Sequence, residues 1–185
     1  MKIGRIYYPV KVLGYGNRLG IWVCGCNKNC IKCISPELKN IMSGKEMSVQ
    51  EIIKFIDGIN DEIDGVTISG GEPFLQDREL AKLTAQLKKY GIDDIIVYTG
   101  YTYDHLLKGN KNIRKILNNI SVLIDGEYIS ELDDGKGIRG SANQNIYVFR
   151  YENRYTDAEN CERNIQAIIT NTHITYIGIP NNERK

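Results

Sequence analysis

Four of the five cysteines lie within ten positions of one another, Cys24, Cys26, Cys30 and Cys33, and the fifth, Cys161, lies far away in the sequence. An odd count with tight clustering favours metal or redox chemistry over a disulfide framework. Three thiolates in the pattern C-x3-C-x2-C can hold an iron–sulfur cluster and leave one iron open to a non-protein ligand. Cys24 remains a possible fourth ligand, and a four-cysteine zinc site is the alternative. We favour iron–sulfur, because zinc ribbons pair two C-x2-C knuckles and this chain has one.

Two glycine-containing segments are further candidates for binding. The segment Ser69-Gly-Gly-Glu-Pro73 combines two glycines, which let a backbone approach a ligand closely, with a carboxylate that can accept from an ammonium group. The segment Gly14-Tyr-Gly-Asn-Arg18 matches neither the P-loop nor the dinucleotide-binding fingerprint. Taken alone, each segment is typical of an ordinary turn.

Strands and helices must position these loops, and the sequence predicts that they alternate. A strand at 18–24 leads into the cysteine loop, and a strand at 65–69 leads into the Gly-Gly-Glu loop. Ser48 and Glu51 form a capping box that begins a helix, with Gly58 near its end. The remaining expected elements are a helix at 76–90, a strand at 94–99, one or two helices at 103–118, strands at 121–124, 145–149 and 175–179, and a helix or loop at 160–170. This alternation predicts an α/β fold with a mostly parallel sheet.

Length and composition limit the classes of function. The 185 residues suggest one domain, 1–185, in which 150–185 form a C-terminal extension of uncertain role. The net charge of +1 argues against nucleic-acid binding, which calls for a basic excess. No apolar run reaches the roughly 18 residues that span a bilayer, and the first residues lack a signal-peptide pattern. We therefore expect a cytoplasmic protein with no membrane or nucleic-acid partner.

In their order along the chain, these motifs resemble the radical SAM superfamily. The resemblance implies a partial (βα) barrel of mostly parallel strands and a [4Fe-4S] cluster held by Cys26, Cys30 and Cys33. It also implies that the open iron binds S-adenosylmethionine through its amino and carboxylate groups. The cofactor-binding residues implied in this way are Ser69, Gly70, Gly71, Glu72, Thr99 and Asp125. Without the resemblance, Thr99 is equally a strand-end threonine and Asp125 a turn aspartate.

Finer features resemble one branch, the activating proteins of glycyl-radical enzymes, and above all those of anaerobic ribonucleotide reductase. The matching segments are 14–18, 98–101, 122–126 and Arg139-Gly-Ser-Ala-Asn-Gln144, and the last of these is the most specific to the branch. The signature residues to which the resemblance gives no role are Gly14, Gly16, Arg18, Arg139, Ser141, Asn143 and Gln144. Lys32, Ile34 and Glu127 depart from the pattern, since the branch often has aromatic residues near the third cysteine and a basic residue at position 127.

The resemblance implies an activity and a set of partners. The enzyme would cleave S-adenosylmethionine reductively and generate a glycyl radical on a partner enzyme, with electrons from a flavodoxin- or ferredoxin-type donor. Two alternatives stay open. One is a radical SAM catalyst acting on a small molecule or peptide, similar to a deazapurine synthase, and the other is a non-catalytic iron–sulfur binding protein.

Overall fold

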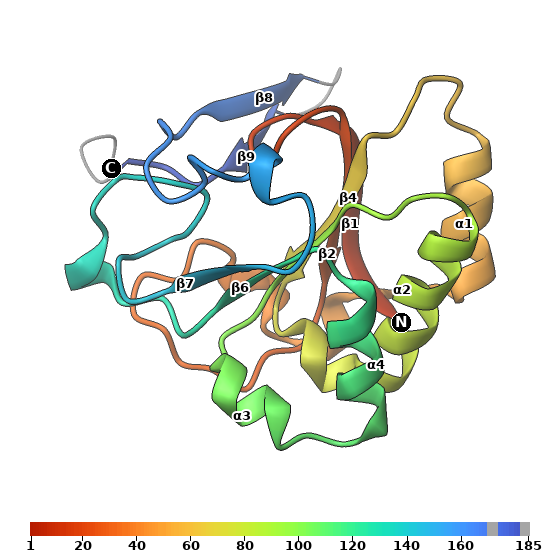
Figure 1. Ribbon diagram of the computed structural model, residues 1–185, viewed down its shortest axis with the longest axis horizontal. Coiled ribbons are helices and arrows are strands. Elements are labelled where there is room, and N and C mark those ends of the chain that lie inside the picture. Colours follow the sequence, from red (N-terminus) through yellow and green to blue (C-terminus); the bar gives the residue numbers. More distant parts are fainter. Residues whose placement is uncertain (170–173, 182–185) are drawn as a thin grey trace.

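The computed structural model describes residues 1–169 and 174–181, and in this part the chain folds around one large mixed β-sheet (Figure 1). The sheet has seven strands in the order β3-β1-β2-β4-β5-β6-β7. They are β1 (Lys2–Val10), β2 (Arg18–Val23), β3 (Lys45–Glu46), β4 (Gly65–Gly70), β5 (Ile95–Tyr98), β6 (Val122–Asp125) and β7 (Asn145–Val148). The predicted α/β class is confirmed.

The four central strands, β2, β4, β5 and β6, run parallel to one another, and the outer pairs are antiparallel. Parallel strands place their carboxyl ends at one edge of the sheet. The loops that follow them therefore meet there, at the edge where ligands usually bind in such sheets. The sequence predicted these four strands, but it gave no sign of β1, whose glycine, arginine and proline weaken the strand pattern.

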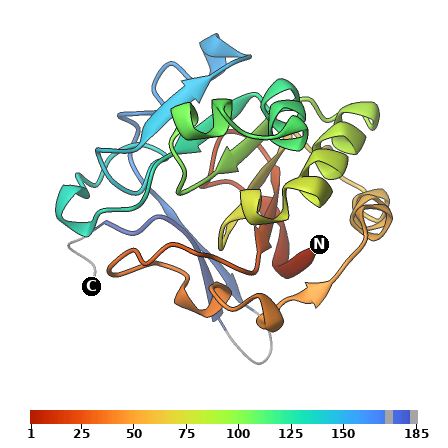
Figure 2. The same ribbon diagram turned by 90° about the horizontal axis from the view of Figure 1, so that it is seen from below.

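The main helices pack on one face of the sheet (Figures 1 and 2). They are α1 (Val49–Asp57), α2 (Asp77–Lys89) and α4 (Lys111–Asn119), with the short α3 (Tyr103–Leu107) between the last two. The predicted capping box of α1 is present, because Ser48 Oγ accepts from the Glu51 N–H and the Glu51 carboxylate accepts from the Ser48 N–H. Side chains alternate along a strand, so Leu19 and Ile21 of β2 face these helices, whereas Trp22 belongs to a second core on the other face.

A β-hairpin covers part of that second face. Its strands are β8 (Ile165–Ile169) and β9 (Ile174–Gly178), and they lie on the side of the sheet away from α1 and α2 (Figures 1 and 2). Ile177 of β9 is buried in the same core as Trp22. The structure corrects the sequence prediction for 160–170. Residues 160–164 form a loop, but the residues that follow form strand β8 rather than a helix, because pairing with β9 and packing of Ile168 on the second core stabilise a strand there.

In the part of the chain that the structure describes, no helix is long and apolar enough to cross a membrane.

Candidate functional site

A cavity of about 500 Å³ lies where the parallel strands end, and it brings most of the predicted site residues together. Cys26, Cys30 and Cys33 line it from the loop after β2. The loops after β4, β5 and β6 line it as well. Of the other predicted residues, those that contribute to its wall are Ser69, Gly70, Gly71, Glu72, Thr99 and Gln144. Asp125, Arg18, Arg139, Ser141, Asn143, Gly14 and Gly16 are not part of the lining.

The three cavity cysteines differ from Cys24 in their surroundings. Cys26, Cys30 and Cys33 are half-buried free thiols, whereas Cys24 is fully buried in the core beside Trp22 and Leu38 and does not line the cavity. Cys24 therefore lies in the core, outside the cavity, and is not placed to act as a fourth ligand. Three thiols facing one cavity are the donor set that a site-differentiated iron–sulfur cluster requires.

Within residues 1–169 and 174–181, no three cysteine, histidine or acidic side chains lie close enough together to hold a single metal ion. A zinc ion needs its four ligands around one centre, whereas each thiolate of an iron–sulfur cluster binds a different iron atom. The cavity wall carries three cysteines rather than the four of the alternative zinc site, which favours a cluster.

The surroundings of Cys26 and Cys30 disfavour the charged thiolate form. Burial is the largest effect on the pKa of Cys26, which it raises, and the nearby Glu72, Cys30 and Cys33 raise it further. Burial likewise raises the pKa of Cys30. The Lys28 N–H opposes the shift at Cys26 by donating to its Sγ at 3.4 Å. Because metal binding requires the thiolate form, iron would supply the charge that offsets the desolvation.

The two glycines of the Gly-Gly-Glu loop allow two backbones to touch. The Gly71 N–H donates to Val23 O at 2.8 Å, and the Glu72 N–H donates to Gly25 O at 2.7 Å. Gly70 has φ +116°, and a Cβ there would collide with the backbone of Val23. The loop after β4 is therefore fastened to the first residues of the cysteine loop, at positions where only glycine fits.

The Glu72 side chain is fully buried and its carboxylate already accepts three hydrogen bonds. Oε1 accepts from the Phe74 N–H at 3.0 Å and from Thr99 Oγ1 at 2.8 Å, and Oε2 accepts from the Gly100 N–H at 2.7 Å. Burial raises the pKa of Glu72, against the opposing effect of these three donors and of Lys28. Glu72 thus joins the loops after β4 and β5, and it does so at the wall of the cavity.

Asp125 ends β6 and is almost completely buried. Its Oδ2 accepts from the Tyr103 N–H at 2.6 Å, and its Oδ1 accepts from the side-chain amide of Asn145 at 3.0 Å. These contacts hold the beginning of α3 and of β7 in place. Asp125 therefore shapes the cavity from outside its lining.

The Arg139–Gln144 segment supports the loop that follows β6. Gln144 Nε2 donates to Gly126 O at 2.7 Å, and the Asn143 amide donates to Glu127 O at 2.8 Å. Ser141 Oγ accepts from the Ile129 N–H at 3.1 Å, and Arg139 donates to Gln144 O at 3.3 Å. This segment fixes one wall of the cavity, mainly through backbone groups.

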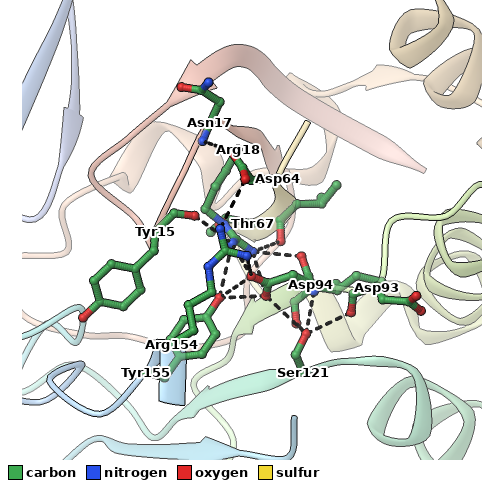
Figure 3. Close-up of polar contacts among 12 residues, drawn as sticks. Tyr15, Asn17, Arg18, Asp64, Thr67, Asp93, Asp94, Ser121, Arg154 and Tyr155 are labelled. Carbon is green, nitrogen blue, oxygen red and sulfur yellow. Dashed lines mark hydrogen bonds and ion pairs between the residues drawn. The ribbon is translucent and has the colours of Figure 1, made fainter. Parts of the chain in front are cut away.

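Arg18 lies at the opposite end of β2 from the cysteine loop, in a buried polar network (Figure 3). Its guanidinium donates to Asp94 Oδ2 at 3.0 Å and to Thr67 Oγ1 at 2.7 Å. Tyr155 donates to the same Asp94 carboxylate at 2.7 Å. Gly14 and Gly16, with φ +116° and +80°, form the turn that delivers Arg18 to this network. The Gly-x-Gly-x-Arg signature thus lies outside the cavity lining, where it ties β2, β4 and β5 to the C-terminal segment.

Sequence reasoning missed three residues near the cavity. Lys28 lines it from within the cysteine loop and lies over the ring of Tyr101, with Nζ 4.3 Å from the ring centre. Tyr98 is half-buried in its wall and donates to Ile138 O at 2.6 Å. Arg163 forms a buried ion pair with Asp133 at 2.7 Å. Of the three, only Lys28 could have been singled out from the sequence, because it lies between the candidate ligands Cys26 and Cys30.

Comparison with known proteins gives a consistent answer. The 4Fe-4S single cluster domain family matches residues 12–147. The anaerobic ribonucleoside-triphosphate reductase-activating protein of Haemophilus influenzae is 36% identical over 152 residues, which is 78% of this chain and 96% of that protein. The protein of the same name from Escherichia coli K12 is 31% identical over 152 residues, 78% of this chain and 97% of that protein.

The chain belongs to the radical SAM family of activating proteins. A further relative, the pyruvate formate-lyase-activating enzyme of Clostridium pasteurianum, is 32% identical over 147 residues, 76% of this chain and 61% of that protein. The family match supports a [4Fe-4S] cluster as the group for which the cavity thiols are suited. The match also ends at residue 147, before the β8–β9 hairpin begins.

Proposed function

We propose that this protein is an activating enzyme that cleaves S-adenosylmethionine reductively and generates a glycyl radical on a partner enzyme of the anaerobic ribonucleotide reductase type. The observation that carries the proposal is one cavity lined by both the C-x3-C-x2-C thiols and the Gly-Gly-Glu loop. The relatives named as activating proteins support the same activity.

Cys26, Cys30 and Cys33 would hold the cluster. When bound, a [4Fe-4S] cluster would supply the electron for reductive cleavage of S-adenosylmethionine, the chemistry from which hydrogen abstraction at the partner's glycine would follow. The chain's own residues bind, orient and exclude water. The half-buried position of the three thiols keeps bulk water from most of their surface.

The loops after β4 and β5 would receive S-adenosylmethionine. Glu72 links the cysteine loop to the loop after β5, since its N–H donates to Gly25 O and its carboxylate accepts from the Gly100 N–H. Ser69 and Thr99 line the same wall. We assign these residues to positioning the co-substrate beside the cluster, with Asp125 and the 139–144 segment holding the wall behind them.

The sheet itself would act as a partial (βα) barrel whose inner face carries the cavity. Trp22 and Tyr98 contact the cavity from that face, and the segment from about residue 150 adds the β8–β9 hairpin to it. In this proposal, 1–185 form one domain. A flavodoxin- or ferredoxin-type protein would deliver the electron in the cytoplasm.

The test is radical formation on the partner. The reconstituted protein is mixed anaerobically with S-adenosylmethionine, dithionite and the anaerobic ribonucleoside-triphosphate reductase of the source organism, and the glycyl radical is counted by electron paramagnetic resonance. We expect a radical with the wild type and none with Cys30→Ala. Cys161→Ala is the matched control, since this half-buried thiol lies outside the cavity lining. A folded, cluster-containing wild type that forms no radical contradicts the proposal.

A further inference from the structure

The β8–β9 hairpin has two apolar faces, and the described part of the chain covers only one of them. The inner face packs on the sheet, where Ile177 is buried and Gln166 donates to Pro9 O at 2.7 Å and accepts from the Lys11 N–H at 3.0 Å. The outer face consists of two directly opposed pairs, Ala167 with Tyr176 and Ile169 with Ile174.

The side chains of the outer face are apolar, yet most of their surface is exposed to solvent. Ile169 is 75% exposed, Tyr176 67% and Ile174 53%. An antiparallel hairpin with one solvated face normally carries polar side chains there. Clustered apolar side chains on a surface mark a contact site for another molecule, whereas single exposed apolar residues do not.

The outer face is continuous with the cavity. Tyr176 belongs to the outer face and also lines the cavity that Cys26, Cys30 and Cys33 line. The cysteine loop adds Ile34, which is 59% exposed and lines the cavity as well. A segment that enters this cavity can therefore contact Tyr176.

Within residues 1–169 and 174–181, no segment covers the outer face, as the exposure of its side chains shows. The residues outside the described part are Thr-Asn-Thr-His at 170–173 and Asn-Glu-Arg-Lys at 182–185, all of them polar. The hairpin also lies beyond the part of the chain that the family match spans.

We propose that the outer face of the hairpin is the docking surface for the partner enzyme, and that Tyr176 and Ile34 flank the glycine-bearing segment as it enters the cavity. This inference rests on the proposed function. The hairpin thereby selects which glycyl-radical enzyme the protein activates. The occupant presents an apolar surface next to its glycine, because apolar side chains on the outer face are stabilised by burial against apolar ones.

The experiment measures how radical formation depends on the concentration of partner. Reconstituted wild type and the triple variant Ile169→Ser, Ile174→Ser, Tyr176→Ser are titrated with the anaerobic ribonucleoside-triphosphate reductase of the source organism. All three side chains are exposed, so the variant keeps its core. We expect the partner concentration for half-maximal activation to rise by about tenfold or more, as for removal of the central contacts of an interface. For the double variant Ile169→Ser, Ile174→Ser, whose positions lie outside the cavity lining, the maximal radical yield at saturating partner stays close to that of the wild type.

Phe55→Ser is the matched control, because Phe55 is 43% exposed on α1, on the far face of the sheet. Its titration curve is expected to coincide with that of the wild type. A triple variant with an unchanged half-maximal concentration overturns the inference. So does a wild-type dimer, seen by sedimentation, that the triple variant converts to a monomer without any change in activation, because the face then serves a second copy of this chain. A wild type that forms no radical at all is the failure of the proposed function instead.

Discussion

Lys28 Nζ lies 2.9 Å from Glu127 Oε1, and this ion pair joins the cysteine loop to the loop that follows β6. The two residues are 99 positions apart in the sequence. Lys28 is also placed over Tyr101, whose hydroxyl accepts from the Asn27 amide at 2.9 Å. Lys28 lines the cavity, so the pair holds part of the cavity wall in place. Glu127 departs from the branch pattern, and the structure gives the departure a reason, since a basic residue at 127 would face Lys28.

Reversing the charge of Glu127 should loosen the cysteine loop while barely changing global stability. We expect Glu127→Lys to lower the free energy of unfolding by less than about 1 kcal/mol, because Glu127 is half exposed and such pairs contribute little. Loss of iron to a chelator should become several-fold faster. The swapped variant Lys28→Glu/Glu127→Lys should restore the slow rate, since it rebuilds the pair. Equal rates of iron loss in all three proteins would show that the pair does not hold the loop.

Replacing Arg18 should strongly lower the free energy of unfolding without altering the cavity. The Arg18 side chain is fully buried and Asp94 nearly so, and the pair is shared with Tyr155 and Arg154 (Figure 3). Arg18→Met leaves the Asp94 charge with only part of its compensation, which costs about 3–5 kcal/mol. Urea denaturation would reveal this loss. A loss below about 1 kcal/mol would contradict the structural role that we give to the Gly-x-Gly-x-Arg signature.

Gly70 and Gly91 both have a positive φ, so comparing their alanine variants separates the cost of backbone strain from the cost of a steric collision. Gly70 has φ +116° and Gly91 has φ +93°, but a Cβ at Gly91 meets no atom within 4 Å, whereas one at Gly70 strikes the backbone of Val23. Gly91→Ala should cost about 1–2 kcal/mol from the left-handed backbone alone. Gly70→Ala should cost more and also lower the iron content per folded chain, because it pushes the cysteine loop away. Iron analysis beside urea denaturation tests both statements. Similar losses of stability and equal iron content in the two variants would exclude this role for Gly70.

Asp64 should contribute stability that disappears in acid. The Asn17 N–H donates to its carboxylate at 2.8 Å and, with Arg154, holds the pKa of Asp64 below its ordinary value of 3.8. A carboxylate whose pKa is lower in the folded state stabilises the fold above its unfolded pKa. That contribution is lost as pH falls through the folded pKa. Asp64→Asn should therefore reduce stability at pH 7 and narrow its gap to the wild type below about pH 3.

The comparison uses the cluster-free chain in urea, so that acid loss of iron does not intervene. Asp61→Asn, at an exposed neighbouring position, is expected to leave the acid profile unchanged. A gap between Asp64→Asn and the wild type that stays constant from pH 7 to pH 3 would argue against the depressed pKa.

Local chemistry determined what the sequence could predict. The sequence predicts the Ser48 capping box, the four parallel strands and the loops that end them, because each of these depends on residues that are neighbours in the sequence. The side chains of Cys24 and Cys26 point to different environments, and this depends on how the strand end packs against Leu38. Nothing near Cys24 in the sequence indicates that choice.

The roles of polar residues were harder to predict, because their partners are distant in the sequence. The sequence suggests Glu72 as an acceptor for an ammonium group, whereas in the structure its carboxylate accepts from Phe74, Thr99 and Gly100. Strand β8 was not predicted for a similar reason. The strand is stabilised by pairing with β9, and the sequence of β8 alone does not indicate that pairing.

The most direct test of the central claim is the release of 5′-deoxyadenosine. The protein is reconstituted anaerobically with iron and sulfide, supplied with S-adenosylmethionine, dithionite and the partner reductase, and the nucleoside is quantified for wild type, Cys26→Ala, Cys30→Ala, Cys33→Ala and Cys161→Ala. We predict release by the wild type and by Cys161→Ala, and none by the three variants of the cavity cysteines. Release that persists in any of those three would contradict the ligand assignment. Its absence from a wild type with a full cluster would contradict the proposed chemistry.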